Sequence, residues 1–392
     1  MRYLLLLLFL GSSLLQAGLP RVSPENAGLN PRALEHADRA IERAVTEKTI
    51  PGAVLAVVYK QKLVWLKAYG HRQTEPRLLP MKTNTLFDLA SLTKPLATGT
   101  TVMQLIEQGR LRLADKVSDF LPGFKSWQDS SGHTRPIRII HLLTHCSGLP
   151  AYAHPSLLKK LYGRVDRATL EKHIDTVERL YEPGREFKYS GLNMISLQRI
   201  IEQISGEKLA DYTRERIFRP LNMHDTAFRL TPEQIERCAP TEILADGTLL
   251  KGVVHDPMAR EAMNGLSSNA GLFSTAEDLA VYAAMLLNKG RAGKSAILSP
   301  RAVWRFTHIP DGYEKIGRAL TWDVSSPYAS NQGDLLSAET YGHTGYTGTS
   351  LVIDPQNNLA IILLTNRVHP RDKGSVVRLR GEVANAVAGA LP

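Results

Sequence analysis

The chain has 392 residues, of which 43% are hydrophobic and 22% are charged, and its formal net charge is +10. These proportions are ordinary for a soluble globular protein, and the length suffices for two domains or for one large domain with an insertion. The sequence has no low-complexity tract or solenoid-type repeat, and its basic residues are scattered. Scattered charge argues against nucleic-acid binding, which needs a concentrated basic surface.

The first 17 residues have the pattern of an export signal. Arg2 supplies a positive charge, an apolar core follows at Leu4–Leu10, and "LLQA" predicts cleavage after Ala17. The apolar run is too short to span a bilayer. We therefore expect a secreted or periplasmic mature protein that has no integral membrane segment once the signal is removed.

The next hundred residues predict a helix, two strands and the start of a second helix. Apolar residues recur at helical spacing over 30–48. The segment 53–70 is rich in β-branched and apolar residues, which predicts two strands around a turn at 60–62. From Pro95 the pattern is helical again, and Gly109 is the expected end of that helix.

Between residues 100 and 265 the helical pattern dominates. The clearest later helices are predicted at 193–205, 209–218 and 274–290. The last of these begins with a capping box, in which Ser274 is the cap and Glu277 stands three residues later. The C-terminal part predicts three strands and a final helix, at 339–345, 349–355, 359–366 and 376–390.

Strands at both ends of the chain and helices in its middle predict an α+β fold. The simplest arrangement is one antiparallel sheet that is built from both chain ends and flanked by helices, with an inserted all-α domain. We expect the sheet domain to comprise 18–98 and 265–392, and the insertion to comprise 99–264. The active site would lie where the two regions meet.

Two cysteines, Cys146 and Cys238, are too few for a disulfide framework. Export would allow them to pair, but pairing depends on a geometry that spacing does not reveal. We expect both to be unpaired and buried.

The pattern Ser-x-x-Lys is a candidate nucleophile with its base, and it occurs three times. The copies are Ser91/Lys94, Ser156/Lys159 and Ser205/Lys208. The second copy lies beside another lysine and reads as solvated surface, and the third lies at a Ser-Gly turn between helices. Only the first follows a strand-like stretch and opens an apolar helix.

Ser91 is therefore the candidate nucleophile. Pro95 is tolerated only near a helix start, so Ser91 would lie in the first turn, where backbone amides favour a developing anion. Lys94 would lie on the same helix face. A lysine can take the serine proton where burial or nearby positive charge lowers its pKa. On this pair alone, a capping serine remains an equal alternative.

Two later segments carry further candidates. Tyr189 lies in a glycine-flanked turn before a helix, where it could pass a proton, although a packed aromatic is the commoner role. His343, Thr344 and Gly345 lie on a predicted strand, whose edge could pair with substrate backbone and donate an amide to an oxyanion. A plain strand that ends at a glycine is the alternative.

Together these segments resemble the serine β-lactamase and penicillin-binding-protein superfamily, in its class C-like branch with related esterases and D-aminopeptidases. The Ser-x-x-Lys motif of that superfamily matches Ser91 and Lys94. Its Tyr-Ser/Ala-Asn element is similar to residues 189–191, and its Lys/His-Thr-Gly strand is similar to 343–345. The stretches "IRIIHLLTHCSGLP", "GLSSNAGLFSTAEDLAVYAAMLL" and "GTSLVIDP" also resemble it.

The resemblance implies a role for each matched residue. Ser91 would be acylated, with Lys94 and Tyr189 sharing the base and acid roles. The backbone amides of Ser91 and Tyr346 would form the oxyanion hole, and residues 343–345 would contact substrate. The implied fold is an α/β sandwich with an all-α insertion, and the resemblance implies no metal or organic cofactor.

Two departures from the family pattern bear on the substrate. Gly191 stands where the family often has asparagine, and Asn193 is either its substitute or a helix-facing side chain. His343 replaces a lysine, so a full charge is expected mainly below its ordinary pKa of about 6.5. Together the two departures predict that neutral short-chain esters or amides are turned over better than penicillins at pH 7.5, and the histidine predicts that relative activity on carboxylate substrates rises towards pH 6.

The leading hypothesis is an exported serine hydrolase that acts through an acyl-enzyme on a small-molecule or cell-wall-derived ester or peptide. Peptidoglycan D,D-carboxypeptidase and β-lactamase are the alternatives, and both would need an arginine for the substrate carboxylate that the sequence does not place. A non-catalytic module that binds cell-wall peptide is an alternative of another class. Retention of all three candidate catalytic residues argues against that module.

Overall fold

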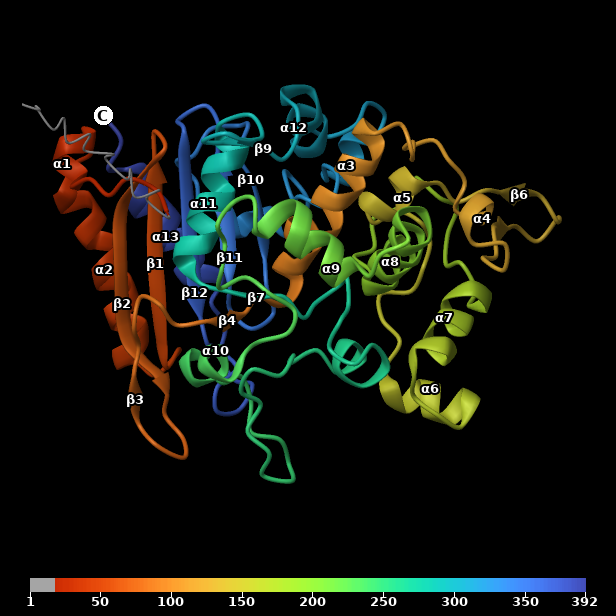
Figure 1. Ribbon diagram of the computed structural model, residues 1–392, viewed down its shortest axis with the longest axis horizontal. Coiled ribbons are helices and arrows are strands. Elements are labelled where there is room, and N and C mark those ends of the chain that lie inside the picture. The colour runs from red at the N-terminus through yellow and green to blue at the C-terminus, as the bar shows by residue number, and fades with distance from the viewer. Residues whose placement is uncertain (1–17) are drawn as a thin grey trace, which may run out of the picture.

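The computed structural model describes residues 18–392, so the predicted export signal lies outside the described residues. Its centre is an antiparallel six-stranded sheet (Figure 1). In sheet order the strands are β10 (Tyr341–Thr344), β11 (Ser350–Asp354), β12 (Leu359–Thr365), β1 (Gly52–Tyr59), β2 (Lys62–Gln73) and β3 (Leu79–Pro80). Because β12 pairs with β1, the two chain ends share one sheet, and this prediction is confirmed.

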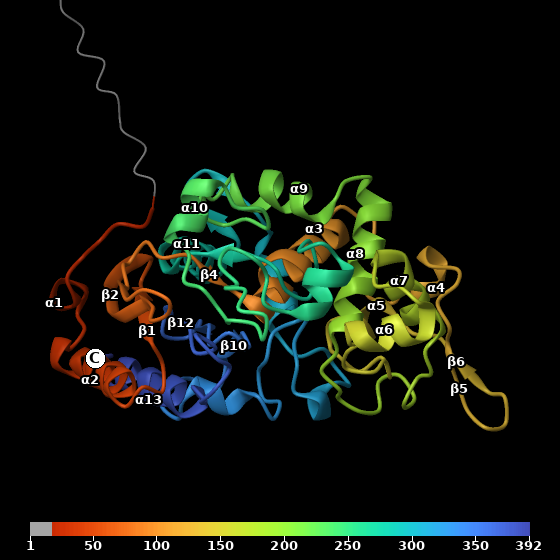
Figure 2. The same cartoon turned by 90° about the horizontal axis from the view of Figure 1, so that it is seen from below.

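Helices cover both faces of the sheet, which explains why every residue of β1 is buried. α2 (Pro31–Thr46) and α13 (Val377–Ala388) lie on one face, and α11 (Ala276–Leu287) packs against the other (Figure 2). Side chains alternate along β1, so Leu55 packs in the apolar cluster of α2 and α13, while Val54 packs in that of α11. Each fully buried side chain of this kind contributes about 1.5–3 kcal/mol.

Local sequence signals account for the first elements. The side chain of Asn30 accepts a hydrogen bond from the N–H of Arg32 at 3.1 Å and caps α2, with proline at the first helical position. Lys60 and Gln61 form the turn between β1 and β2 with φ values of 48° and 65°. Two left-handed residues suit the twist of a two-residue hairpin. The predicted helix, strands and turn are confirmed here.

Between β3 and α11 the chain forms helices joined by long loops, with only short strands (Figure 1). The helices are α3 (Thr100–Glu107), α4 (Val117–Phe120), α5 (Ile139–Leu143), α6 (Pro155–Tyr162), α7 (Arg167–Thr176), α8 (Gly191–Ser205), α9 (Leu209–Thr213) and α10 (Pro232–Arg237). Tighter or wider turns occur at η1 (Ala90–Leu92), η2 (Lys94–Gly99), η3 (Arg214–Phe218) and η4 (Met258–Ala262). The helices predicted at 193–205 and 209–218 are thus confirmed.

Short elements complete the described chain. They are α1 (Pro24–Ala27), α12 (Pro300–Thr307), η5 (Glu314–Ile316), η6 (Ala329–Gln332) and the strand pairs β4 (Phe87–Asp88) with β7 (Phe273–Ser274), β5 (Trp127–Gln128) with β6 (Thr134–Arg135), and β8 (Arg291–Ala292) with β9 (Ser295–Ala296). The β5–β6 hairpin projects from the helical region, at the end remote from the sheet (Figure 2).

The predicted capping box of α11 is wrong by one residue. Thr275 is the cap, and its hydroxyl accepts a hydrogen bond from the N–H of Asp278 at 3.2 Å. Ser274 instead ends β7, and its hydroxyl hydrogen-bonds to that of Thr226 at 2.7 Å. Serine and threonine both cap helices well, so pairing between β4 and β7 selects which of the two does so.

Two further predictions concern exposure and membranes. Cys146 and Cys238 are both buried and unpaired, as expected. Within residues 18–392, no helix has the length and apolar character needed to cross a membrane.

Candidate active site

Ser91 lies on a tight turn between β4 and the helical segment that follows. Ala90 has a left-handed φ of 46°, which costs a non-glycine residue about 1–2 kcal/mol. Asp88 holds this turn, because its Oδ1 accepts the N–H of Ala90 at 2.8 Å and its Oδ2 accepts the N–H of His255 at 2.7 Å. Burial raises the pKa of the Asp88 carboxyl. Sequence reasoning missed this aspartate, although it stands just before the motif.

Lys94 points directly at the candidate nucleophile. Its Nζ lies 2.8 Å from Ser91 Oγ and donates to the carbonyl oxygen of Asn269 at 2.7 Å. The side chain is 2% exposed, and no carboxylate in the described chain forms an ion pair with it. One helical turn separates the serine from the lysine, so the predicted proximity follows from local geometry.

Tyr189 completes the group around Lys94. The Lys94 Nζ lies 4.9 Å from the centre of the Tyr189 ring, and the centre of the His145 ring lies 4.5 Å from it. The neighbouring backbone is held in place, because Ser190 donates its N–H to His145 Nδ1 at 3.2 Å and its hydroxyl to the carbonyl of Pro150 at 2.6 Å. The "HCSGLP" stretch therefore positions this tyrosine.

His343 is buried, and this environment lowers its pKa instead of leaving it at the ordinary value of about 6.5. Its Nδ1 donates to the carbonyl of Thr344 at 2.9 Å, so Nε2 is the acceptor that faces the Tyr189 hydroxyl at 3.4 Å. Burial, followed by the positive charges of Arg318 and Lys94, holds the pKa of His343 well below its ordinary value. A lowered pKa argues against the predicted gain in activity on carboxylates towards pH 6, because the ring would then gain little charge in that range.

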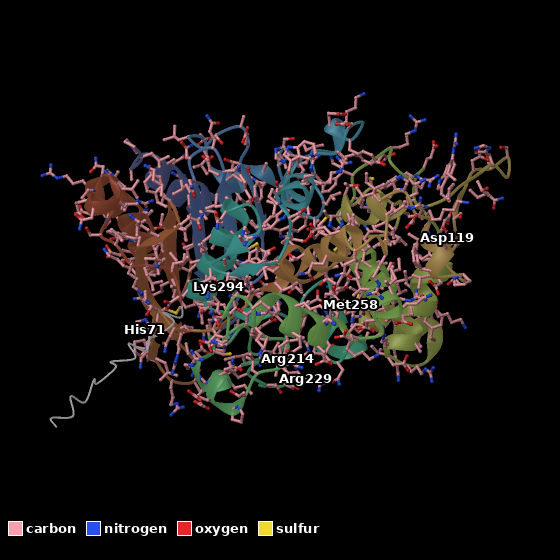
Figure 3. All side chains as sticks on the ribbon, turned by 45° about the horizontal axis from the view of Figure 1, so that its top comes forward. His71, Asp119, Arg214, Arg229, Met258 and Lys294 are labelled. Carbon is pink, nitrogen blue, oxygen red and sulfur yellow. The ribbon has the colours of Figure 1, made fainter. Side chains whose placement is uncertain are left out.

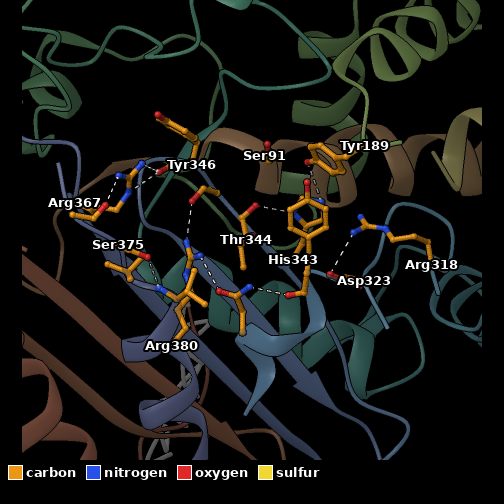
Figure 4. A pocket seen from close by; sticks show the side chains of 16 residues that line it. Ser91, Tyr189, Arg318, Asp323, His343, Thr344, Tyr346, Arg367, Ser375 and Arg380 are labelled. Atoms are coloured by element: carbon orange, nitrogen blue, oxygen red, sulfur yellow. Dashed lines mark hydrogen bonds and ion pairs between the residues drawn. The ribbon is translucent and has the colours of Figure 1, made fainter. Parts of the chain in front are cut away.

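A cavity of about 410 Å³ opens over these side chains (Figure 4). Six of the sequence-predicted site residues line it, namely Ser91, Tyr189, His343, Thr344, Gly345 and Tyr346. Gly345 packs so closely that a Cβ would overlap with Thr349 Oγ1 and the carbonyl oxygen of Leu89. The turn after β10 is thereby pressed against the turn that carries Ser91.

Three arginines that the sequence did not place also line the cavity, together with Asp323 (Figure 4). Arg318 is 1% exposed, and its guanidinium lies 5.6 Å from the Tyr189 ring and 3.5 Å from Asp323. Arg367 pairs with Asp372 at 2.8 Å. Arg380 has no carboxylate partner in the described chain, and burial lowers its pKa to about 9. The cavity wall is therefore net positive.

Asn193 does not join this group. Its side chain is fully buried, accepts a hydrogen bond from Ser147 at 2.6 Å and lies 3.2 Å from His145 Nδ1. Residues two apart on a helix point in nearly opposite directions, so Asn193 cannot stand in for a side chain at Gly191. A Cβ at Gly191 would lie 3.1 Å from Met258 Cε and 3.5 Å from Asn269 Nδ2, so these two side chains occupy the adjoining space.

The other two Ser-x-x-Lys pairs serve the helices that carry them. Ser156 follows the cap of α6, while Lys159 is exposed in the last turn of that helix. Lys208 lies 3.6 Å from Glu202 in the described chain and lines a second cavity of about 590 Å³. Arg214 and Arg229, which also line that cavity, lie close together on one face of the molecule (Figure 3).

Comparisons with known proteins identify the family. The Beta-lactamase family model matches residues 37–385. An N-acetylmuramyl-L-alanine amidase of Bacillus subtilis is 33% identical over 381 residues, which cover 89% of this chain and 84% of the relative. A protein of Escherichia coli K12 named "Putative D-alanyl-D-alanine carboxypeptidase" is 34% identical over 377 residues, which cover 90% and 86%.

Solved structures show the same fold. The hydrolase EstCE1 has a TM-score of 0.72 at 24% identity, over 91% of this chain and 99% of its own. A penicillin-binding protein homologue from Caulobacter crescentus has a TM-score of 0.70 at 17% identity, over 93% and 99%. The fold and the site define a serine hydrolase. The chain belongs to the beta-lactamase family.

Proposed function

We propose that this protein is an exported serine hydrolase that forms an acyl-enzyme on Ser91 and acts on a cell-wall peptide with a terminal carboxylate. The observation that carries the proposal is the 2.8 Å contact between Ser91 Oγ and Lys94 Nζ at the floor of a positively charged cavity. A hydroxyl in direct contact with a buried amine is the arrangement that serine activation requires.

In the acylation step, Ser91 Oγ attacks the substrate carbonyl carbon while its proton passes to the base formed by Lys94 together with Tyr189. The carbonyl oxygen becomes an oxyanion and accepts hydrogen bonds from the backbone amides of Ser91 and Tyr346. When the bond to the leaving group breaks, its nitrogen or oxygen takes a proton from the Tyr189 hydroxyl, and Tyr189 regains one from Lys94. The products are the free leaving group and an ester on Ser91.

In the deacylation step, a water molecule replaces the leaving group. It gives one proton to the same base and attacks the ester carbon, and the oxyanion again forms between the two amides. Collapse returns the proton to Ser91 Oγ and releases a carboxylic acid. The same residues therefore serve both half-reactions.

The charge of the cavity supports a substrate that carries a carboxylate. Arg318, Arg367 and Arg380 line its wall, with Asp323 as the one acidic residue among the described lining side chains. Guanidinium groups recognise carboxylates through paired donors. The name of the Escherichia coli relative refers to a D-alanyl-D-alanine peptide, which ends in such a carboxylate.

Hydrolysis of a neutral ester is the second candidate, and the lowered pKa of His343 favours it. This histidine occupies the strand position where the superfamily often has a permanently charged lysine. Without that charge, penicillins lose one contact for their carboxylate. A neutral ester needs no such contact.

The proposal also places the mature protein outside the cytoplasm. The pattern of residues 1–17 supports export, and the names of both curated relatives refer to components of the cell wall. Sequencing the N-terminus of envelope or medium protein tests this part directly. Material that begins at Met1 would contradict it.

A matched pair of peptides tests the substrate class. One peptide ends in D-alanyl-D-alanine, and the other has the same sequence with its terminal carboxylate converted to an amide. Intact-mass kinetics with both peptides, a penicillin and a p-nitrophenyl ester should show a transient adduct on wild type and none on Ser91→Ala. Preference for the free carboxylate supports the first candidate, and preference for the ester supports the second. Binding without any adduct would indicate a non-catalytic module.

A further inference from the structure

The turn that joins β10 to β11 supplies one of the two amides of the proposed oxyanion hole. Gly345 donates its N–H to the carbonyl of Thr349 at 2.7 Å, which closes the turn. In contrast, the N–H of Tyr346 has no hydrogen-bond acceptor in the described part of the chain. A free amide beside Ser91 is available to an oxyanion only if its peptide plane has the correct orientation.

Arg380 binds the carbonyl side of the peptide that carries the Tyr346 N–H. Its Nη2 donates to the carbonyl of Gly345 at 2.9 Å and to that of Thr349 at 2.8 Å. Figure 4 shows Arg380 in the wall of the cavity. The peptide between Gly345 and Tyr346 is trans, so its carbonyl and its N–H point in opposite directions. A guanidinium that binds the carbonyl therefore directs the N–H to the other side of the plane.

The charge of Arg380 adds to this geometric effect. A cation that binds the carbonyl oxygen polarises the peptide unit, which makes the N–H of the same unit a better donor. Arg380 is 8% exposed and its Nη1 donates to Asn331 Oδ1 at 3.2 Å, while no carboxylate in the described chain pairs with it. Its hydrogen-bond acceptors are thus uncharged oxygens, and two of them belong to this turn.

A second arginine acts on the following peptide. Arg367 donates from Nε and Nη2 to the carbonyl of Tyr346 at 3.0 and 2.6 Å. Unlike Arg380, it has a carboxylate partner, Asp372. Both peptide carbonyls that flank the amide of Tyr346 are therefore bound by guanidinium groups, but only the group on Gly345 belongs to the same peptide as that amide.

We propose that Arg380 is a positioning residue for acyl transfer, which fixes and polarises the Gly345–Tyr346 peptide so that the Tyr346 N–H faces the oxyanion above Ser91. This inference rests on the proposed acyl-enzyme function. It assigns to the last helix of the chain, α13, a part in transition-state stabilisation. In this role Arg380 acts through the peptide and does not contact the reacting atoms.

The test compares Arg380→Ala and Arg380→Lys with a matched control, Arg378→Ala. Arg378 lies two residues earlier on the same helix, its side chain is 92% exposed, and it pairs with Glu382 at 2.7 Å. The substrate is a neutral p-nitrophenyl ester, so that lost binding of a carboxylate cannot imitate the effect. Thermal melting of each variant reports folding.

We expect kcat of Arg380→Ala to fall by about 100-fold, the effect of losing one oxyanion-hole donor, while KM stays within about threefold. Affinity for a phenylboronic acid, whose tetrahedral adduct places an oxygen in the hole, should fall with kcat. Arg380→Lys should be intermediate, since an ammonium keeps the charge without the planar fork. Millimolar guanidinium should restore part of kcat to Arg380→Ala, and Arg378→Ala should match wild type.

Three results would overturn the inference. The first is that both Arg380→Lys and Arg380→Ala keep the kcat of wild type. If Arg380→Ala does not fold, a wild-type kcat in Arg380→Lys is sufficient to overturn the inference. Another is a loss in KM with kcat unchanged. The third is a loss confined to the D-alanyl peptide, which would make Arg380 a carboxylate anchor. A wild-type protein that fluorophosphonate does not label would instead refute the proposed function.

Discussion

Lowering the pH from 8 to 6 tests whether His343 stays neutral in the active site. The groups that face it are Arg318, Lys94 and Arg380, which repel a positive charge, and Tyr189 and the Thr344 carbonyl, which bind the neutral ring. Together with burial, the three cations keep the pKa of His343 well below 6.5. Because histidine is uncharged above its pKa, a depressed pKa means that we expect His343 to stay largely uncharged at both pH values.

The ordinary pKa of histidine sets how large the pH effect would be if His343 did titrate. An exposed histidine with a pKa of about 6.5 would be about 3% charged at pH 8 and about 76% charged at pH 6. If that charge bound the substrate carboxylate, the preference for a carboxylate substrate would rise by up to about 25-fold over this range. A histidine held neutral should leave the preference unchanged.

The assay measures kcat/KM for the D-alanyl-D-alanine peptide and for its amide at pH 6, 7 and 8. Titration of the base affects both substrates alike, so it cancels in their ratio. We expect the ratio to have the same pH profile in wild type and in His343→Gln. Asp323 also lines the cavity, and burial raises the pKa of its carboxyl. If protonation of this carboxyl raises the substrate ratio at low pH, the rise should be absent in Asp323→Asn.

A ratio that rises more than about fivefold in wild type but stays flat in His343→Gln would refute the reasoning. It would mean that the ring gains a proton near pH 6.5 despite its burial. The assignment of Nε2 as an acceptor for Tyr189 would then fail as well.

The remaining predictions need simpler measurements. Ser91→Ala should abolish labelling by fluorophosphonate, and persistent labelling would exclude it as the nucleophile. Lys94→Ala should slow acylation by about 10³-fold or more, as expected for one member of a coupled catalytic unit, and stopped-flow acylation rates measure this. Gly345→Ala should lower both melting temperature and activity, because its Cβ has no room, whereas the Cβ of Gly123→Ala meets its nearest atom at 3.4 Å and should be tolerated. Edman sequencing of exported protein should begin near Gly18, and an uncleaved chain would contradict the export signal.

Sequence alone determined the parts of this protein that depend on neighbouring residues. Ser91 and Lys94 meet because three residues make nearly one helical turn, whatever surrounds them. The hairpin at Lys60–Gln61 and the cap at Asn30 follow from equally local geometry. Ser274 and Thr275 could each cap α11 on local grounds. Pairing of Ser274 with the distant strand β4 left Thr275 as the cap.

Only the tertiary structure decided which distant residues share the cavity. Arg318 and Asp323 come from a loop and Arg380 from the last helix, and no local pattern distinguishes them from surface residues of the same types. The burial of His343 and the charges around it likewise depend on distant residues. Lys94, for example, precedes His343 by 249 positions in the sequence. A pKa reflects all charges and all solvent around a group, and that environment exists only after the two chain ends have joined in one sheet.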